Sequence, residues 1–452
     1  MMMGSARETR NRYGASAAGA VKVTSEGYRI VHSYRVPLPS PAFSGDPASP
    51  YGVAVDIGTT TIALELVDRV TGAVLASVSL LNSQRRWGSD VISRIRAANS
   101  GQGAAMQRAV HQNVLDGILR LVQTAGIAGS RIGCVTVAAN TVMAHLFLGL
   151  SCAGMGQSPF TPEATEFAEI LFYDLFSTDL SVHLPSAGCT VLVLPALSAF
   201  VGGDVVAGAC SLPEDSPDPR LFIDLGTNAE MVLTVNGRHY CASAAAGPAF
   251  EGGSISCGTG CIPGAVSSVT SSGSRFEYET IPGGDDNRPA GICGSGILDF
   301  TACALESGLI QPDGALAPVC AESGVRLDAA GVVRLTQQDV REIQLAKAAV
   351  RSGIAVLLEK AGLSAEDVLS VILAGGFGLY LRERSALAIG LLPASFAGRI
   401  FAPGNTSLAG AVGRLLDDSM EMRYRTFVGA AETVTLAEYP GFEKMFISGI
   451  NF

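Results

Sequence analysis

The pattern of apolar and polar positions changes at Tyr51. From that residue onward, short β-rich apolar runs alternate with helical patterns, which is typical of an α/β protein. Residues 1–50 are instead rich in Pro, Ser, Gly and Ala, with one strand-like piece at Val21–Val36 and five prolines from Pro37 to Pro50. We interpret residues 1–50 as an N-terminal extension and linker.

A second break interrupts the apolar pattern at Leu212–Pro219, where three prolines and three acidic residues occur within eight positions. It divides the rest of the chain into two parts of similar size. The sequence therefore predicts a first subdomain over residues 51–215 and a second over residues 216–452.

The two predicted subdomains begin with the same local pattern. Val53–Thr61 is an apolar strand that ends in Asp, followed by a Gly-hydroxyl turn and a second strand, and Leu221–Ala229 repeats this order. A further hairpin follows each copy, with turns predicted at Thr71-Gly72 and at Asn236-Gly237. Two such patterns in matched contexts predict a duplicated fold.

Composition and charge exclude several classes of protein. Apolar residues make up 48% of the 452 residues, enough for a large core, and the net charge of −10 without basic runs argues against nucleic acid or an anionic membrane as partner. The uncharged run Ile132–Pro162 is interpreted as a buried strand and a core helix, not a membrane span. The ten cysteines lie mostly in apolar stretches without a CxxC pair, and the chain starts without an apolar signal region. We expect a soluble cytoplasmic protein with buried free thiols.

The repeated turn has the residue types of a phosphate site. Glycine lets the backbone approach a ligand, and the following N–H groups and hydroxyls can surround phosphate oxygens. A carboxylate at the strand end, Asp56 or Asp224, can hold Mg²⁺ through water. Ordinary hairpins would explain one copy, whereas two copies favour binding of a nucleotide triphosphate from both sides. The predicted phosphate-binding residues are Gly58, Thr59, Thr60 and Thr61 in the first copy, and Gly226, Thr227 and Asn228 in the second.

A third glycine-rich element follows a buried strand at Ser370–Gly378. Its Gly375 and Gly376 would provide a flat backbone for an adenine or ribose. The preceding helix is predicted to run from Gln344 to Ala361, with Gly362 as its stop. Gln344 and Lys347 share one face of that helix, either as a solvated face or as nucleoside contacts.

This order of motifs resembles the actin/Hsp70/sugar-kinase superfamily. In that family's terms, Asp56–Thr61 and Asp224–Asn228 resemble the two phosphate motifs, and Phe377 lies in the counterpart of the adenosine motif. Gly202–Gly208 and Ser407–Gly413 resemble the two connecting helices. The resemblance implies a duplicated actin-like (ribonuclease H-like) ATPase fold of class α/β, with two subdomains and an interdomain nucleotide cleft.

One branch of the superfamily is more similar than the rest. The runs YGVAVDIGTTTIALELVD, FVGGDVVAGA, FIDLGTNAEMVL, AGPAFEGGSISCG, CGSGILD, LAGGFGLYL and NTSLAGA resemble the ATP-dependent reductive activators of corrinoid proteins. The resemblance covers most of the chain, from Tyr51 to Phe452. It implies use of ATP to help return an inactive cob(II)alamin to cob(I)alamin in a corrinoid methyl-carrier protein.

The chain departs from that branch in its cysteines. Such activators typically carry a plant-type ferredoxin domain ahead of the ATPase, whereas the first cysteine here is Cys134. The resemblance is therefore to the ATPase module alone, and electrons would come from a separate ferredoxin-type donor. Cys257 and Cys261 lie close together in the sequence, and related dehydratase activators share an iron–sulfur cluster across a dimer. No further thiolate lies at ligand spacing here, so we expect no iron–sulfur cluster.

The leading hypothesis is a cytoplasmic protein that binds and hydrolyses ATP and reactivates a corrinoid protein, as a possible homodimer. Asp56 and Asp224 would organise Mg²⁺. Asp204 would position the attacking water, with Glu251 as the second candidate, because catalysis at such sites is mainly positioning and electrostatics. Two alternatives remain open: a small-molecule kinase of the same superfamily, and a nucleotide-switched binding protein without useful turnover.

Overall fold

The computed structural model describes residues 22–24, 27–29, 38–41, 45–176, 185–213, 216–272, 275–284, 288–375 and 380–452. The described residues form two compact units. The first unit lies within Tyr13–Asp215 and Asn405–Thr433, and the second within Ser216–Gly404 and Val434–Phe452. The predicted second subdomain differs from this division at Asn405–Thr433, which groups with the first unit because its helix packs on the first unit's sheet.

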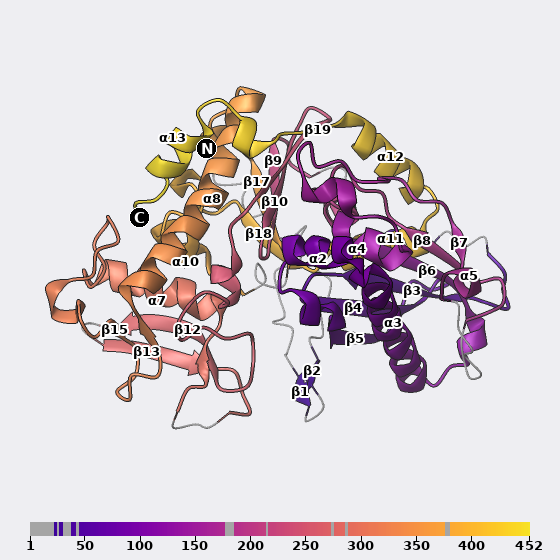
Figure 1. Ribbon diagram of the computed structural model, residues 1–452, viewed down its shortest axis with the longest axis horizontal. Coiled ribbons are helices and arrows are strands. Elements are labelled where there is room, and N and C mark those ends of the chain that lie inside the picture. Colours follow the sequence, from indigo (N-terminus) through magenta and orange to yellow (C-terminus); the bar gives the residue numbers. More distant parts are fainter. Residues whose placement is uncertain are drawn as a thin grey trace, which may run out of the picture. The chain divides into compact units, whose positions relative to one another are not determined.

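The first unit is built on a six-stranded sheet with the strand order β5-β4-β3-β6-β8-β7 (Figure 1). Strands β3, β4 and β5 form an antiparallel meander, and β6 and β8 continue from β3 in parallel. The strands of the unit are β1 (Lys22–Thr24), β2 (Gly27–Arg29), β3 (Tyr51–Ile57), β4 (Thr61–Asp68), β5 (Val74–Leu81), β6 (Ile132–Ala139), β7 (Ile170–Leu171), β8 (Thr190–Val193) and β19 (Ala431–Thr433). Its α-helices are α2 (Val91–Ala97), α3 (Gly103–Ala125), α4 (Thr141–Leu148), α5 (Phe172–Phe176), α6 (Gly203–Ser211), α11 (Thr406–Leu416) and α12 (Met420–Ala430).

The second unit contains the strand order β18-β17-β9-β10-β11. Strands β9, β10 and β11 form an antiparallel meander, and β17 and β18 continue from β9 in parallel. The strands of the unit are β9 (Arg220–Leu225), β10 (Ala229–Val235), β11 (Arg238–Ala244), β12 (Ala265–Ser272), β13 (Arg275–Thr280), β14 (Gly291–Ile292), β15 (Val325–Arg326), β16 (Arg334–Leu335), β17 (Ser370–Ala374) and β18 (Ile400–Gly404). Its α-helices are α7 (Gly294–Glu306), α8 (Gln337–Ala361), α10 (Glu383–Ala388) and α13 (Phe442–Ser448).

The same strand order therefore occurs once in each unit, which confirms the duplicated α/β fold. The local turn chemistry is also as predicted. Asn236 and Gly237 both have positive φ, 50° and 75°, and join β10 to β11, as a two-residue hairpin requires. The uncharged run of the first unit forms strand β6 followed by helix α4.

Helix α8 extends further toward its N-terminus than predicted. It begins at Gln337, seven positions before the expected start at Gln344, and ends at Ala361 with Gly362 in the left-handed conformation. A capping box explains the earlier start, because the Thr336 hydroxyl accepts from the Asp339 N–H while the Asp339 carboxylate accepts from the Thr336 N–H.

Successive side chains along β3 point to opposite faces of the first sheet. Val53, Val55 and Ile57 lie in the apolar core that α3 and α4 cover. The intervening positions face the other way, where α11 packs against β3 and β6. Asp56 therefore points toward α11 and away from the core.

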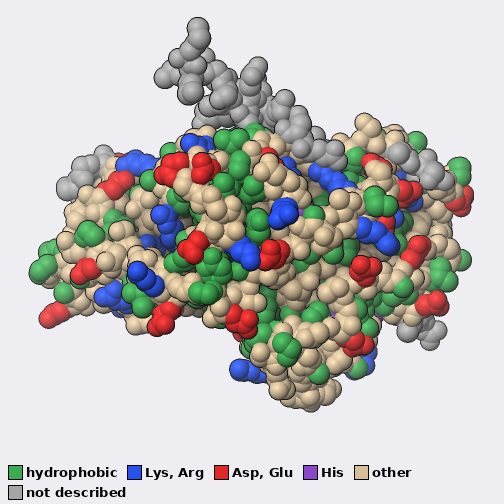
Figure 2. All heavy atoms as spheres, turned by 90° about the horizontal axis from the view of Figure 1, so that it is seen from above, with side chains coloured by type: hydrophobic (Ala, Val, Ile, Leu, Met, Phe, Trp, Pro, Cys, Tyr) green, Lys and Arg blue, Asp and Glu red, His purple; other side chains and the backbone are tan. Residues whose placement is uncertain are grey.

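The surface charges, the described helices and the cysteines can be compared with the sequence expectations. On the face shown in Figure 2, Lys and Arg side chains are interspersed with Asp and Glu side chains. Among the described helices, none combines the length and the apolar character needed to cross a membrane. Eight of the ten cysteines are buried, while Cys257 is partly exposed and Cys261 is exposed.

Candidate functional site

The first predicted phosphate loop is a tight turn between β3 and β4. The Gly58 N–H donates to the Thr61 carbonyl oxygen over 2.9 Å, so the chain folds back within three residues. A Cβ at Gly58 would lie 2.8 Å from that same oxygen, which explains why the position is glycine. Thr59 and Thr60, which are at least partly exposed, form the tip of the turn.

Three polar side chains that the sequence analysis missed hold this loop. The Asn82 Nδ2 donates to the Gly58 carbonyl over 2.9 Å, and the Asn140 Nδ2 donates to the Thr59 Oγ1 over 3.2 Å. The guanidinium of Arg94 donates to the carbonyls of Thr59 and Gly88. Asn82 and Asn140 are also helix caps, a signal visible in the sequence, but their contacts with the loop depend on tertiary packing.

Arg94 is fully buried, which is unusual for a charged residue. Burial lowers the pKa of its guanidinium to about 10, against the opposing effect of Asp90 at the start of the same helix. Its hydrogen bonds to backbone carbonyls compensate part of the desolvation cost. The side chain therefore acts as an internal support beneath the first loop.

Asp56 is held by the first turn of α11. Its two carboxylate oxygens accept hydrogen bonds of 2.8 Å from the Asn405 Nδ2 and the Ser407 Oγ. Asn405 is also the N-cap of α11, because its Oδ1 accepts from the Leu408 N–H. Burial raises the pKa of the Asp56 carboxyl above its usual value, and the two hydrogen bonds oppose this effect.

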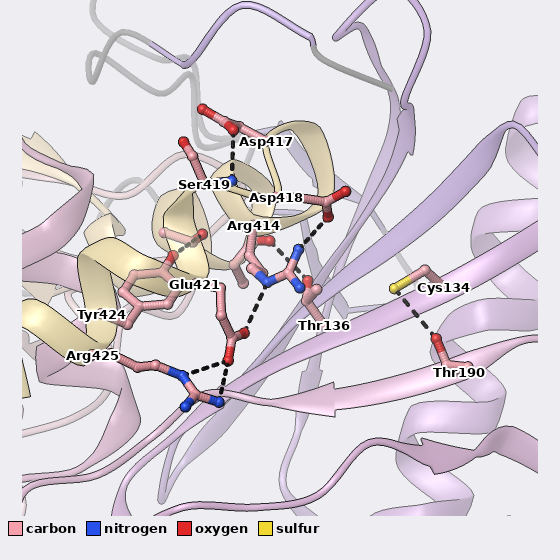
Figure 3. A network of polar contacts seen from close by, with 12 residues as sticks. Cys134, Thr136, Thr190, Arg414, Asp417, Asp418, Ser419, Glu421, Tyr424 and Arg425 are labelled. Carbon is pink, nitrogen blue, oxygen red and sulfur yellow. Dashed lines mark hydrogen bonds and ion pairs between the residues drawn. The ribbon is translucent and has the colours of Figure 1, made fainter. Parts of the chain in front are cut away.

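Helix α11 is fixed along its length by further contacts within the first unit (Figure 3). The Thr136 hydroxyl donates to the Ala411 carbonyl over 2.8 Å, and the Tyr424 hydroxyl donates to the Gly410 carbonyl over 2.7 Å. Near the C-terminal end of α11, Arg414 forms ion pairs with Asp418 and Glu421. These contacts fix the position of the helix turn that holds Asp56.

Asp204 lies in the first turn of α6, close to the support of the first loop. A Cβ at Gly202 would lie 2.6 Å from the Asp204 Oδ1 and 2.4 Å from the Asn140 Cα. The glycine therefore lets the start of α6 approach the residue that contacts Thr59. The Asp204 Oδ1 also accepts from the Val205 N–H over 2.8 Å.

The second predicted phosphate loop, between β9 and β10, brings Glu251 to its side. The Gly226 N–H donates to the Asn228 carbonyl over 2.8 Å, and the Thr227 Oγ1 donates to the Glu251 Oε2 over 3.1 Å. Burial raises the pKa of the Glu251 carboxyl, and hydrogen bonds from Thr227 oppose it. Glu251 ends a short 3₁₀-helix, Pro248–Glu251, between Gly247 and Gly252, which both have positive φ.

The glycine-rich element after β17 approaches Asp224 closely. Ala374 is the register partner of Asp224 in the parallel pair of β17 and β9. Gly375 has a φ of 83°, and a Cβ there would lie 2.5 Å from the Asp224 Oδ1. The structure thus brings Gly375 to the second strand-end carboxylate. The predicted Gly376, and Phe377 beside it, lie outside the described residues.

Gln344 and Lys347 do not form a solvated helix face. Both are buried, at 0% and 2% exposure, so this interpretation is wrong for these two residues. The Gln344 Nε2 donates to the Ile450 carbonyl over 3.1 Å, and the Lys347 Nζ donates to the Asn451 carbonyl. Burial lowers the pKa of Lys347 to about 8, with a smaller effect from the nearby Arg351.

The residues of each loop fit a magnesium nucleotide chemically. Carboxylate oxygens are the ligands that Mg²⁺ prefers, and backbone N–H and hydroxyl groups suit phosphate oxygens. The described residues contain no cluster of three or more His, Cys, Asp and Glu side chains arranged to hold a metal ion. At either loop, Asp56 or Asp224 would therefore hold Mg²⁺ together with phosphate oxygens and water.

The repeated strand order, with a strand-end Asp and a following glycine turn in each copy, defines the actin-like class of ATPase folds. Family models agree with this assignment. Residues 218–452 match the C-terminal domain of RACo, described as the ASKHA domain, and residues 51–213 match the RACo middle region. The chain belongs to the RACo family.

Individual relatives are similar over most of the chain. The corrinoid activation enzyme RamQ of Eubacterium limosum is 34% identical over 367 residues, which cover 76% of this chain and 60% of that protein. The [Co(II) methylated amine-specific corrinoid protein] reductase of Methanosarcina barkeri is 28% identical over 396 residues, which cover 82% of this chain and 70% of that protein. The chain thus spans less than two thirds of the length of RamQ.

A solved structure is similar as well. The reductive activator for a corrinoid, iron–sulfur protein superposes with a TM-score of 0.78 at 31% sequence identity. The superposition covers 90% of this chain and 67% of the other. The similarity therefore includes both units of the present chain.

Proposed function

We propose that this protein binds and hydrolyses ATP and thereby activates a corrinoid protein for reduction. In this proposal, nucleotide-driven closure promotes reduction of cob(II)alamin to cob(I)alamin, with electrons from a separate ferredoxin-type donor. The observation that carries the proposal is the pair of strand-end carboxylates, Asp56 and Asp224, each followed by a tight turn with a glycine and hydroxyl or amide side chains. Membership of the RACo family and the names of the relatives support the corrinoid part.

The chain's own residues have distinct roles in this proposal. Thr59, Thr60, Thr227 and Asn228 bind phosphates, and Gly375 and Gly376 carry the nucleoside. Bound Mg²⁺ would neutralise charge on the phosphates. Asp56 and Asp224 orient that ion, and their neighbours restrict the carboxylates to one orientation.

Two carboxylates are proposed to position the attacking water, Asp204 and Glu251. The contact between Glu251 and Thr227 supports Glu251, because it holds the carboxylate against the second loop. Its raised pKa has a consequence for rate: activity that needs the ionised carboxylate falls as pH drops through the raised pKa.

Substitution of the two strand-end aspartates tests the ATP site. We expect Asp56→Asn and Asp224→Asn each to reduce Mg²⁺-dependent ATP turnover by at least about a hundredfold, because electrostatic stabilisation of phosphoryl transfer is lost. Asparagine preserves the side-chain shape, and Asp116→Asn on α3 serves as the control. If both variants hydrolyse ATP at the parent rate, the two-loop proposal is wrong.

Reduction of a corrinoid protein tests the second half of the proposal. A cob(II)alamin-containing corrinoid protein is mixed with a ferredoxin-type donor, and cob(I)alamin is followed by its visible absorption. We expect cob(I)alamin to accumulate only when both this chain and ATP are present. ATP consumption that requires a small-molecule acceptor would instead indicate a kinase.

A further inference from the structure

A buried carboxylate at the start of α8, Asp339, holds a loop that is distant in sequence. Asp339 is 2% exposed. Its Oδ1 accepts a hydrogen bond of 2.6 Å from the Ser256 N–H, and its Oδ2 accepts one of 2.7 Å from the Ser256 hydroxyl. The Oδ2 also accepts from the N–H and the hydroxyl of Thr336, over 2.8 and 2.7 Å. Two donors therefore come from the helix cap and two from the distant Ser256.

The contacts with Ser256 go beyond what a helix cap requires. A capping box uses the donors of the cap residue alone, which here is Thr336. Burial of a carboxylate is costly unless hydrogen bonds compensate it, and hydrogen bonds to an ionised acceptor are short and strong. The carboxylate of Asp339 therefore fixes both the backbone and the side chain of Ser256.

The turn that contains Ser256 packs directly on the backbone next to Glu251. A Cβ at Gly258 would lie 2.2 Å from the Gly252 carbonyl oxygen, and a Cβ at Gly252 would lie 2.7 Å from the Thr259 carbonyl oxygen. The two sides of the turn are thus in backbone contact, with no side chain between them. A displacement of Ser256 would therefore be transmitted to Gly252 and to the adjoining Glu251.

Further contacts fix the ends of the same segment. Phe250 and Ile255 are buried in the core of the second unit. The Cys257 Sγ donates to the Arg334 carbonyl over 3.0 Å, directly before α8 and its cap. The segment from Phe250 to Cys257 is therefore attached to the core and to the start of α8.

Glu251 is the acidic residue of this segment, and its carboxylate lies at the second phosphate loop. Its Oε2 accepts from the Thr227 hydroxyl over 3.1 Å. Its Oε1 lies 3.5 Å from the position that a Cβ on Gly226 would occupy. The backbone on which Asp339 acts thus carries the carboxylate that contacts this loop.

We propose that Asp339 is a positioning residue for Glu251 in ATP hydrolysis, an inference that rests on the proposed function. Asp339 fixes Ser256, the turn of Ser256 fixes Gly252, and this backbone determines where the Glu251 carboxylate lies. A displacement of about 1 Å in a catalytic arrangement can cost about a hundredfold in rate. The contacts of Asp339 therefore act on the chemical step, whereas ATP binding depends on the phosphate loops.

Two variants weaken the contact from either side. Ser256→Ala removes a hydroxyl donor, and Asp339→Asn replaces one acceptor oxygen by an N–H group. We expect each variant to lower kcat for ATP hydrolysis by about tenfold or more, and to keep KM for ATP within about twofold of the parent.

Thr336→Ala is the matched control. It removes a cap hydroxyl from the same carboxylate and keeps both hydrogen bonds to Ser256. This variant should lower the midpoint of thermal unfolding, because the cap of α8 is weakened, and it should keep the parent's kcat. A kcat that falls equally in Thr336→Ala and Ser256→Ala would show that the stability of α8, and not the position of Glu251, determines the rate.

A combination with Glu251→Gln separates positioning from general damage. If Asp339 acts through Glu251, then adding Asp339→Asn to Glu251→Gln should change kcat by less than about twofold, whereas independent losses would multiply. Hydrogen exchange of the backbone from Phe250 to Cys257, measured without nucleotide, should be faster in Asp339→Asn and Ser256→Ala than in the parent and in Thr336→Ala.

The outcomes distinguish this inference from the proposed function. Parent-like kcat in Glu251→Gln would remove Glu251 from the proposed mechanism, and the role of Asp339 with it. A loss of kcat in Glu251→Gln, with parent-like kcat in both Asp339→Asn and Ser256→Ala, would overturn the role of Asp339 alone. Losses that multiply in the double variant, or unchanged hydrogen exchange, would also overturn it.

Discussion

At the scale of single residues, the two strand-end aspartates are held by different means. Asp56 has both oxygens occupied by donors from α11, Asn405 and Ser407. Asp224 lies against the backbone of Gly375, at a distance that a Cβ would not permit. The position of the first carboxylate therefore depends on Asn405 and Ser407, and that of the second requires a glycine at residue 375.

Gly375→Ala tests this dependence. A positive φ in a non-glycine residue costs ~1–3 kcal/mol, and the added Cβ would also overlap the Asp224 Oδ1. We expect Gly375→Ala to lower the free energy of unfolding of the second unit and to weaken ATP binding by displacing Asp224. Thermal unfolding and nucleotide titration measure the two effects.

Gly362→Ala provides the matched control. Its φ of 68° gives similar backbone strain, but a Cβ there has open space around it. This variant should lose stability and keep the parent's ATP affinity. Equal ATP affinity in Gly375→Ala and the parent would contradict a role of Gly375 in placing Asp224.

At the scale of secondary-structure elements, the first loop is supported from three separate parts of the chain. Asn82 begins the 3₁₀-helix Ser83–Trp87, Arg94 lies in α2, and Asn140 caps α4. Each donates a hydrogen bond to Gly58 or Thr59. The turn therefore keeps its shape because three packed elements fix it.

Arg94 makes this support testable. Hydrogen bonds of charged groups contribute ~1.5–3 kcal/mol each, so we expect Arg94→Met to lower the stability of the first unit by at least about 2 kcal/mol and to weaken ATP binding. Arg94→Lys keeps the charge, but its ammonium group cannot replace the planar guanidinium that reaches both Thr59 and Gly88. Its stability and ATP affinity should lie between those of Arg94→Met and the parent. Urea unfolding followed by the fluorescence of Trp87 measures the stability.

The exposed Arg108 on α3 is the control for charge alone. Arg108→Met should leave the unfolding midpoint and ATP affinity unchanged. An equal loss in the Arg94 and Arg108 variants would show that net charge, and not the support of the loop, determines the effect.

At the scale of the whole molecule, each unit has a core of its own. The single tryptophan of the chain, Trp87, lies in the first unit and therefore reports on that unit alone. Two histidines are buried in the same unit, His111 and His145. The pKa of each is lowered from 6.5 by burial, with backbone hydrogen bonds acting in the opposite direction.

These histidines predict how the stability of the first unit depends on pH. The folded unit keeps them neutral, whereas the unfolded chain binds protons below about pH 6.5, so the free energy of unfolding falls as pH decreases. The loss is at most about 1.4 kcal/mol per pH unit for each proton. Urea unfolding at pH values from 7.5 to 5.5, followed by Trp87 fluorescence, measures this slope.

His145→Gln should reduce the slope, since the His145 Nδ1 donates to the Thr141 carbonyl while its Nε2 accepts from the Ala164 N–H, a pattern that only the neutral ring satisfies. The double variant, with His145→Gln and His111→Gln together, should show a still smaller dependence of the free energy of unfolding on pH. A slope unchanged in both variants would assign the pH dependence to other groups. Asp56 is not one of them, because its raised pKa acts with the opposite sign.

The sequence by itself determined the features that depend on near neighbours. The strand–Asp–Gly turn of each copy, the Asn236-Gly237 hairpin and the stop of α8 at Gly362 follow from interactions over a few residues. The signal for the true start of α8 is also local, although it was not used in the prediction: Thr336 and Asp339, three positions apart, form a capping box.

Only the tertiary structure decided which distant groups meet. Asn405 lies 349 positions from the Asp56 that it binds, and no periodicity relates the two. The same holds for Arg94 beneath Thr59 and for Glu251 beside Thr227. It also holds for Lys347, which the sequence left open between a solvated face and a nucleoside contact and which is buried. Hydrophobic patterning determines which face of an element is covered, but hydrogen bonds between distant side chains require the final position of both elements.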